Sequence, residues 1–475
     1  MKVELLGLSD KKTIERQVNI CAAAGKLSRM PGSVFDAMDS MKDYDTALKF
    51  IQRVIGMGHT STIDHDYLVF ALSDVSPVIE QTVIAERFSS FTVKSRREVD
   101  FSNVGFYVPD FHDEDGNVLS DNTKLKEKYC DHMQSLFESY AKFADNGISK
   151  EDARFVLPYS YHSQFIMGLD GTSLARMIHK LTKSSYSKIT ELKELGEKLK
   201  EIALKRAPYI ESLLKKEEMH EENKVALLLQ DIVPKRDYSL LDKPVLLSST
   251  KDIDKTIFIN AIARISSLDI DAATQIYEEK IDNDKELKEK LMKAIMEDEE
   301  HEDIKHINLR FQLAIPFAIL THYTRHRRLS LSIPAFVPNV DLEKYVMPPS
   351  IKTSELKEFY DDVYKRNKDV YDEFKKYGVR EEDLVYFTLS GNAINVIINF
   401  DGEAFRWICR LRECTKAQWR IREDVTRMHA LVNKVSSYYA KNLGPDCVTK
   451  HVCGEGKESC GRIDGILAKL KEKTH

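Results

Sequence analysis

Two short segments show the alternation of apolar and polar residues that is typical of half-buried strands. The segments HDYLVFAL (65–72) and HINLRFQL (306–313) share His, Leu, Phe and Leu at the same offsets. Further along the chain, GISKEDARFVLP, which starts at Gly147, shares a glycine, a charged turn, an aspartate and an apolar run with GVREEDLVYFTL, which starts at Gly378. Because the two matches recur in the same order at nearly one spacing, the sequence predicts a duplicated domain.

Each half mixes strand and helix patterns, which predicts an α+β fold. Apolar, β-branched residues predict strands near 67–72 and across 307–320, whereas longer periodic stretches predict helices over 190–207 and 404–432.

The boundary between the copies is expected near the segment LLDKPVLLSST (240–250). After it, a lysine-rich and acidic run over 278–306 predicts a solvated helix that leads into the second copy. We therefore expect an N-terminal copy over residues 1–240, a C-terminal copy over 241–445 and a cysteine-containing tail over 446–475.

The composition favours a soluble multidomain protein of the cytoplasm. With 475 residues, 42% of them hydrophobic, the chain can form two or three ordinary cores. A formal net charge of −5 gives no global field that would recommend nucleic acid as a partner. The start, MKVELLGLSD, lacks the apolar core of a signal peptide, and no stretch reaches the ~20 apolar residues that cross a bilayer, so no membrane association is expected.

The segment THYTRHRRLSLSIPAF (321–336) gathers an Arg-His-Arg-Arg cluster at 325–328 beside several hydroxyl groups. Arginine offers a fixed fork of donors and serine a short one, which suits phosphate or pyrophosphate. The alternative is a charged strand end on the surface. In the repeat alignment the first copy lacks this cluster, but it carries Ser95 and Arg97 where the second copy has Ala335 and Val337.

Five blocks resemble motifs of the flavin-dependent thymidylate synthases. RHRRLS is similar to the Arg-His-Arg-x-x-Ser opening of the family's signature, and SFTVKSRRE to its second part. GHTSTIDHDYLVF, ARFVLP and LRECTKAQWRIR resemble its Gly-His-x-Ser/Thr segment, its Ala-Arg-x-Val-Leu-Pro segment and its Leu-Arg-x4-Ala-Gln-x-x-Ile-Arg helix. The resemblance implies two diverged copies of one domain, each an antiparallel sheet flanked by helices, that pair as an intrachain pseudo-dimer.

The resemblance also implies roles for individual residues. The residues expected to bind FAD are Arg325, His326, Arg327, Ser330 and Ser61. The residues expected to bind the deoxyuridine nucleotide are Ser95, Arg97, Arg154, His322, Arg325 and Arg412. Arg412 is also expected to be catalytic, because it would face the uracil and stabilise the anion that develops on the ring.

The implied activity is reductive methylation of dUMP, or of a related deoxyuridine nucleotide, with FAD, NADPH and a methylene-folate carbon donor. Val385 lies opposite Arg154 and Leu181 lies opposite Arg412, so the complementary losses imply one composite site per chain. A homodimer would then imitate the four-domain tetramer of the family. The alternative is a non-catalytic paralogue that binds nucleotide or flavin, because the Asn-Ala-Arg flavin segment of the family is DGT and DGE in the two copies.

The cysteines of the tail are a separate candidate site. Cys447, His451, Cys453 and Cys460 form a set that is compatible with tetrahedral zinc, although their spacing matches no standard motif. Other interpretations are an iron–sulfur centre or a glycine-rich loop that carries cysteines for another reason. Cys414 could attack uracil in principle, but a packing role on the helix of Arg412 is the simpler expectation.

Overall fold

The computed structural model describes the whole chain except residues 8–9, 217–223, 230–231, 234–238, 334–339 and 466–475. The chain forms two compact units: the first contains Met1–Asp237 together with Phe336–Asn392, and the second contains Tyr238–Ala335 together with Ala393–His475. Within the described residues, no helix combines the length and the apolar character that crossing a membrane requires.

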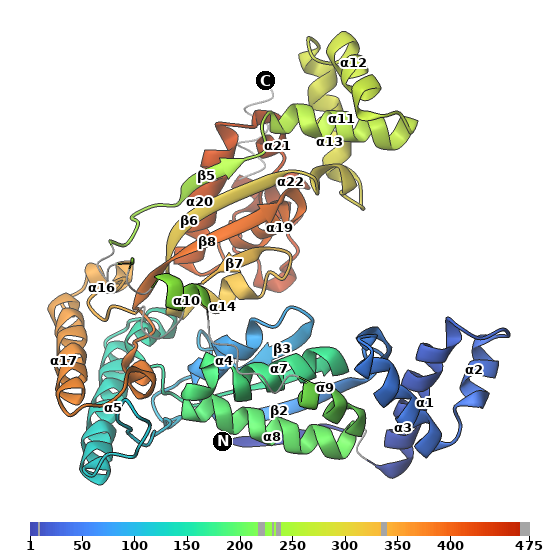
Figure 1. Cartoon of the computed structure of the whole chain (residues 1–475). Helices are drawn as coiled ribbons and strands as arrows, with labels where there is room; N and C mark the ends of the chain where they lie inside the picture. The colour runs from blue at the N-terminus through green and yellow to red at the C-terminus, as the bar shows by residue number, and fades with distance from the viewer. Residues whose placement is uncertain (8–9, 217–223, 230–231, 234–238, 334–339, 466–475) are drawn as a thin grey trace. The chain divides into compact units, whose positions relative to one another are not determined.

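The first unit is built on a four-stranded antiparallel sheet. Its strands, in spatial order, are β1 (Lys2–Leu5), β2 (Tyr67–Val75), β4 (Ser163–Asp170) and β3 (Ser89–Val93). Alternate side chains of β2, among them Phe70, point into the core, as the alternation in the sequence predicts. Helices α7 (Gly171–Lys183) and α8 (Thr190–Arg206) lie over one face of this sheet (Figure 1).

The second unit repeats this arrangement. Its sheet has the order β5 (Val245–Ser249), β6 (Asn308–Pro316), β8 (Ala393–Asp401) and β7 (Ser330–Ser332). Helices α19 (Gly402–Arg412) and α20 (Trp419–Asn433) take the places of α7 and α8. The registers agree as well, because Tyr67 pairs with Asp170 in the first sheet and Asn308 pairs with Asp401 in the second. Shared topology and register confirm two copies of one α+β domain.

Further helices complete the two units. In the first unit they are α1 (Lys11–Leu27), α2 (Val34–Ser40), α3 (Tyr44–Gly56), η1 (Thr60–Ile63), α4 (Pro77–Ile84), α5 (Asn122–Asp145), α6 (Lys150–Ala153), η2 (Arg154–Val156), η3 (Ser185–Lys188), η4 (Pro208–Ile210), α9 (Glu211–Lys216), α10 (Lys224–Leu229), α16 (Pro349–Lys352), α17 (Lys357–Lys376), α18 (Glu381–Leu384) and η6 (Val385–Phe387). In the second unit they are α11 (Ile253–Ser266), α12 (Ile270–Lys280), α13 (Lys285–Glu297), η5 (Glu302–Ile304), α14 (Phe317–Thr324), α21 (Ser437–Lys441), α22 (Asp446–Thr449) and η7 (Gly456–Glu458).

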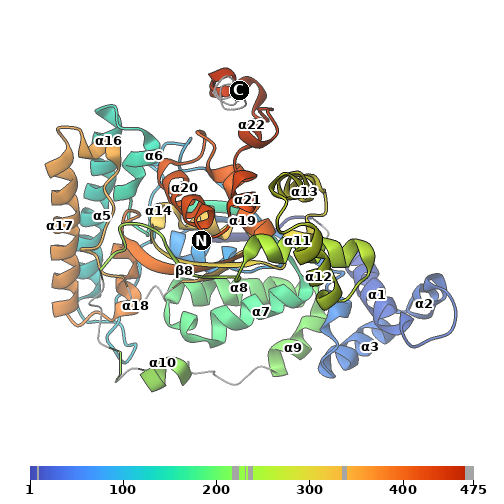
Figure 2. The same ribbon diagram turned by 90° about the horizontal axis from the view of Figure 1, so that it is seen from above.

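One segment of the second copy belongs to the first unit. Helix α17 lies beside helix α5 of the first copy, as both views of the chain show (Figure 2). Polar side chains join the two copies here: His132 Nε2 lies 2.9 Å from Asn367 Oδ1, and the Tyr386 hydroxyl donates to the buried Glu191 carboxylate at 3.0 Å. The compact units therefore differ from the sequence copies, and the copy boundaries 1–240, 241–445 and 446–475 stay a prediction about the repeat.

The Asp-Gly pair that starts α7 and α19 has a structural role in both copies. Asp170 and Asp401 cap these helices by accepting the backbone N–H of Ser173 at 2.7 Å and of Ala404 at 2.6 Å. The glycine that follows sits against a 3₁₀ turn, and a Cβ on Gly402 would lie 2.3 Å from a carbonyl oxygen of η5. Helix capping and close packing explain why the sequence reads Asp-Gly here.

Three sequence expectations need correction. The strand expected over 307–320 ends at Pro316, and α14 follows it. The helix expected over 404–432 breaks between α19 and α20, where the buried Gln418 side chain caps α20. The run 278–306 contains the end of α12, then α13 and η5, because Asp284 caps a new helix by accepting from Leu287 N at 2.9 Å.

Candidate active site

The basic cluster of the second unit forms the turn between α14 and β7. Arg325 is the C-cap of α14, and the chain continues through Arg327 to Ser330 at the start of β7. Arg325, Arg327 and Ser330 are exposed, whereas His326 is only 8% exposed. The turn therefore presents guanidinium groups and a hydroxyl outwards and turns its imidazole inwards.

The imidazole of His326 meets Arg412, the last residue of α19. Arg412 Nε donates to His326 Nε2 at 3.0 Å, and Arg412 Nη2 donates to the carbonyl oxygen of His322 at 3.4 Å. A guanidinium only donates, so His326 Nε2 must accept and the ring proton sits on Nδ1. Burial, reinforced by the charges of Arg412 and Arg325, lowers the pKa of His326 to about 3. His326 is neutral and orients the Arg412 guanidinium.

A buried ion pair lies behind this contact. Arg420 Nε pairs with Asp424 at 3.1 Å, and Arg420 Nη2 donates to the carbonyl oxygen of Ala314 at 3.0 Å. Tyr323, on α14 next to His322, reaches the same carboxylate at 3.4 Å. Burial raises the pKa of Asp424 to about 6 although Arg420 opposes the shift. These bonds tie α14 to α20 beneath the turn.

The first unit brings together Ser95, Arg97 and Arg154. The Ser95 hydroxyl oxygen accepts from Arg97 N at 3.3 Å, and the Arg97 guanidinium forms an ion pair with Glu151. Arg154 Nε donates to the carbonyl oxygen of Glu151 at 3.1 Å. Two residues that sequence reasoning assigned to the nucleotide, Arg97 and Arg154, therefore contact Glu151 at the beginning of helix α6, and Ser95 contacts the backbone of Arg97.

Arg154 holds a buried cation that its surroundings only partly satisfy. Arg154 is only 2% exposed, and its Nη2 atom has no hydrogen-bond partner among the residues that the structure describes. Burial, followed by the charge of Arg96, lowers the pKa of Arg154 to about 10. A buried guanidinium donor without a partner is costly, and an anion placed at Nη2 would relieve that cost.

Arg96 and Glu80 form a buried ion pair near Arg154, and sequence reasoning missed both residues. Arg96 Nη1 donates to both Glu80 oxygens, at 3.0 and 2.8 Å, and to the Tyr161 hydroxyl at 2.6 Å. Burial alone would lower the pKa of Arg96, but the Glu80 carboxylate outweighs it and leaves that pKa raised. The single acidic residue in the apolar helix PVIEQTVI was the signal available, since a buried carboxylate needs a cationic partner.

Ser61 lies at the opposite end of the first sheet. It belongs to η1, just before the residues of β2 that pair with the end of β4. The Ser95 segment follows the residues of β3 that pair with the beginning of β4. The first unit therefore does not bring Ser61 together with Ser95, Arg97 and Arg154. A cavity of about 510 Å³ lies on the open face of the sheet, and its lining does not include Ser61, Ser95, Arg97 or Arg154.

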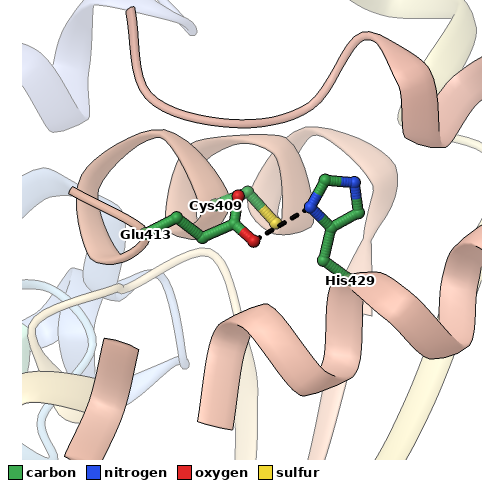
Figure 3. Close-up of side chains that lie close together, drawn as sticks. All are labelled: Cys409, Glu413 and His429. Atoms are coloured by element: carbon green, nitrogen blue, oxygen red, sulfur yellow. Dashed lines mark hydrogen bonds and ion pairs between the residues drawn. The ribbon is translucent and has the colours of Figure 1, made fainter. Parts of the chain in front are cut away.

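A cluster of Cys409, Glu413 and His429 lies near Arg412 (Figure 3). The three ligand atoms lie within 4.8 Å of one another, which is close enough for a metal ion. Both ring nitrogens of His429 are engaged, however: Nδ1 lies 2.9 Å from Glu413 Oε1 and Nε2 lies 2.9 Å from the carbonyl oxygen of Ala440. Both partners only accept, so the ring donates twice and keeps no lone pair for a metal. The cluster is an ion pair beside a buried thiol.

The tail residues lie on or after helix α22. Cys447 and Cys453 are half-buried, Cys460 is exposed, and no disulfide joins any of the seven cysteines. His451 is exposed and adopts a left-handed backbone with φ of 57°. Cys414 lies on the loop between α19 and α20, so the expectation that it sits on the helix of Arg412 is wrong.

Comparisons with known proteins agree with the duplication. The pattern of the thymidylate synthase complementing protein family matches residues 11–209 and again residues 245–436. A flavin-dependent thymidylate synthase of Geobacter sulfurreducens is 28% identical over 127 residues, which cover 26% of this chain and 52% of the relative. A flavin-dependent thymidylate synthase of Clostridium tetani is 27% identical over 166 residues, which cover 33% of this chain and 66% of the relative. The matches thus span between about half and just under two thirds of the length of these relatives.

One solved structure gives a weaker match. It is a UMP/dUMP methylase, PolB, of Streptomyces cacaoi, bound with 5-Br dUMP. That chain is 21% identical, and the match covers 46% of this chain and 97% of that chain with a TM-score of 0.38.

Proposed function

Because this chain belongs to the thymidylate synthase complementing protein family, which it matches in each of its two copies, we propose that it reductively methylates a deoxyuridine nucleotide. The proposed substrate is dUMP or a close relative of it. The observation that carries the proposal is the buried Arg154 guanidinium, whose Nη2 atom lacks a partner among the described residues while Arg97 lies beside it.

The nucleotide phosphate is the anion that we assign to this group. A phosphate offers several acceptor oxygens and a double negative charge, which suits two neighbouring guanidinium groups and a serine hydroxyl. Ser95, Arg97 and Arg154 supply these donors. In this structure Glu151 contacts both arginines, Arg97 through its carboxylate and Arg154 through its backbone carbonyl oxygen. Binding of the phosphate would add the missing acceptor and offset the repulsion between the arginines.

Arg412 is the residue that we assign to the uracil ring. Methylation at C5 makes the ring electron-rich, and a guanidinium near a ring carbonyl stabilises the anion that develops. His326 fixes the direction of Arg412 through Nε2, and its neutral state keeps the positive charge on the arginine. His322 accepts from the same guanidinium through its backbone carbonyl. His326 is therefore a positioning residue in this proposal.

The exposed side of the turn suits FAD. Arg325, Arg327 and Ser330 present two guanidinium groups and a hydroxyl, which is the donor set that a pyrophosphate requires. Bound FAD would supply the hydride chemistry of the reduction, with NADPH as the reductant and methylene-folate as the carbon donor. Ser61 stays a proposed flavin contact. A cytoplasmic homodimer is the proposed form of the enzyme.

Complementary losses support one nucleotide per chain. At the position of Arg154 the second copy has the buried Val385, and at the position of Arg412 the first copy has the buried Leu181. Neither apolar side chain can bind an anion. We therefore propose that residues of both copies serve a single nucleotide.

A non-catalytic nucleotide-binding protein is the second candidate. The observation that favours it is Glu403, a carboxylate where the flavin segment of the family has arginine. Glu403 is buried and pairs with Arg406 at 2.7 Å and with Arg328 at 3.0 Å. The negative charge of Glu403 is thus neutralised by these two neighbouring arginines.

One experiment separates the two candidates. Purified protein is reconstituted with FAD, and its visible flavin band is followed while NADPH is added without oxygen. The enzyme should show a band that NADPH bleaches, and it should convert dUMP to dTMP when methylene-tetrahydrofolate is added. A protein that binds dUMP but takes up no flavin would refute the enzyme and favour the binder.

A further inference from the structure

The turn that carries Ser95 and Arg97 lies just beyond the first sheet. Strand β3 ends at Val93, and in the turn Val99 N donates to the carbonyl oxygen of Ser95 at 3.1 Å. Here the chain has left the ladder of hydrogen bonds that fixes the direction of a strand. Side chains must therefore contribute to the position of this turn.

The middle residue of the turn, Arg96, points inwards. Its side chain is only 10% exposed, and its Nη1 atom donates to both oxygens of Glu80 and to the Tyr161 hydroxyl. Glu80, on α4, is fully buried and also accepts from the Ser163 hydroxyl at 2.6 Å. Ser163 is the first residue of β4, a central strand of the sheet. These hydrogen bonds tie the turn to a helix and to the middle of the sheet.

The second copy has apolar residues at the positions of this polar group. They are Leu320 opposite Glu80, Ile394 opposite Ser163 and, outside the described residues, Phe336 opposite Arg96. Leu320 is the fourth residue of α14, as Glu80 is of α4, and both Leu320 and Ile394 are buried. The second copy also lacks the counterparts of Ser95 and Arg97, so the ion pair and these two residues are lost together.

Stability of the fold does not explain why the first copy keeps a buried ion pair. Removing two charges from water costs free energy, and well-packed apolar residues in their place are often as stable or more stable. The buried Leu320 shows that the same domain accommodates an apolar side chain at this position of the helix. Orientation does explain the ion pair, because a guanidinium nitrogen held by three oxygen atoms fixes the turn in one direction.

We propose that Glu80 and Arg96 are positioning residues for the site at which the nucleotide phosphate binds. By holding the middle of the turn inwards, they keep Ser95 and Arg97 on its accessible side, where Ser95 is exposed and the Arg97 side chain is 31% exposed. Neither Glu80 nor Arg96 touches the nucleotide. The identity of the positioned ligand rests on the proposed function, whereas the anchoring of the turn does not.

The second copy supplies the variant that tests this role. Glu80→Leu combined with Arg96→Phe introduces the residues of the second copy and leaves no unpaired charge. The double variant should resist urea as well as the natural protein does, whereas calorimetric titration should show dUMP binding weakened by about tenfold or more. In the methylation assay the KM for dUMP should rise while kcat stays unchanged, because ground-state and transition-state binding are lost equally.

A buried ion pair at the other end of β4 provides the matched control. Asp66 and Arg206 are both buried and pair at 2.9 Å, and Asp66 directly precedes the residue of β2 that pairs with the end of β4. Asp66→Leu combined with Arg206→Met should leave dUMP affinity unchanged. Equal losses of dUMP affinity in the two double variants would assign the effect to the stability of the unit and overturn the positioning role. Unaltered affinity in the Glu80 and Arg96 double variant would also overturn it.

A second measurement needs no nucleotide. Hydrogen exchange of the free protein should be faster over residues 95–99 in the Glu80 and Arg96 double variant, including at the Val99 amide, and unchanged there in the control. Equal exchange over 95–99 in the natural protein and the double variant would overturn the anchoring. If the natural protein failed to bind dUMP, the proposed function would be refuted, and the exchange rates would still decide whether the ion pair holds the turn.

Ser163→Ala is the milder variant, in case the double variant does not fold. It removes one hydrogen bond to the Glu80 carboxylate and leaves Arg96 in place. Exchange over residues 95–99 should rise, and dUMP affinity should fall by roughly threefold. A Ser163→Ala protein with natural exchange and natural affinity would overturn the proposal.

Discussion

Replacing Arg154 with methionine should move stability and nucleotide binding in opposite directions. Methionine has a similar length, fills an apolar space well and carries no charge. The free protein holds Arg154 as a buried cation with an unpartnered Nη2 atom among the described residues. We expect Arg154→Met to be more stable than the natural protein in the absence of nucleotide, and to bind dUMP weakly.

The magnitude follows from the pKa of Arg154. Its surroundings lower that pKa from the ordinary value of an arginine to about 10, a drop of roughly 2.5. At ~1.4 kcal/mol per unit, the folded protein disfavours the charged group by roughly 3 kcal/mol. The variant also loses the hydrogen bond from Nε to the Glu151 carbonyl, which contributes about 1 kcal/mol. The free energy of unfolding should therefore rise by about 2 kcal/mol.

Two assays test this expectation. Urea denaturation without ligand measures the free energy of unfolding, and calorimetric titration with dUMP measures the affinity. The loss of charge-assisted hydrogen bonds, at ~1.5–3 kcal/mol, should weaken dUMP binding by about tenfold or more. Arg87→Met, an exposed arginine of the first copy, serves as the control and should change neither quantity. A variant that unfolds more easily yet binds dUMP normally would make Arg154 a structural residue and refute the phosphate assignment.

Three further changes test other parts of the structure. His326→Asn removes the Nε2 acceptor of the uracil-facing arginine, so kcat should fall by about tenfold while dUMP affinity changes less, and an unaltered kcat would contradict the positioning role. Burial lowers the pKa of His132, so the folded protein disfavours protonation of this side chain, and its contribution to the free energy of unfolding is kept above pH 6.5 and lost as the pH falls below it. His132→Gln should flatten this decline on the acid side, and equal slopes for the two proteins would argue against it. Gly402→Ala should cost about 1–3 kcal/mol in urea denaturation because its Cβ would meet a carbonyl oxygen at 2.3 Å, whereas Gly454→Ala, which meets nothing within 4 Å, should be neutral, and equal stabilities would contradict the close approach.

The duplication could be predicted from the sequence because strand periodicity is a local property. The alternation in residues 65–72 and 306–313 reports which face of each strand is buried, and both segments became central strands of matching sheets. The fold class followed from the same patterns. Helix breaks were harder, since Gln418 interrupts a continuous helical periodicity by capping its backbone neighbours, and nothing in the apolar pattern requires that.

The candidate site was predictable only where the residues form motifs. The motif arginines at 97 and 154 do come together around Glu151. The pairing of Arg96 with Glu80 depends on contacts between segments that are distant in sequence, and the inward rotation of His326 depends on packing beneath the turn. Such long-range contacts leave no periodic signal. The same reason hides the ion pair of Lys416 with Glu458, which joins the loop after α19 to the tail.

The division of the chain into units constrains the order in which it can fold during synthesis. The first unit needs residues 336–392 for helix α17, which emerge from the ribosome only after the first strands of the second unit have been made. The growing chain must therefore hold an incomplete N-terminal core until residue 392 has been made, and residues 238–335 wait longer still, for β8 and α19. Unlike two domains in series, the first copy cannot complete its unit without a segment of the second copy. Cutting the gene at the repeat boundary should therefore yield two fragments that fold poorly apart and regain structure when they are produced together.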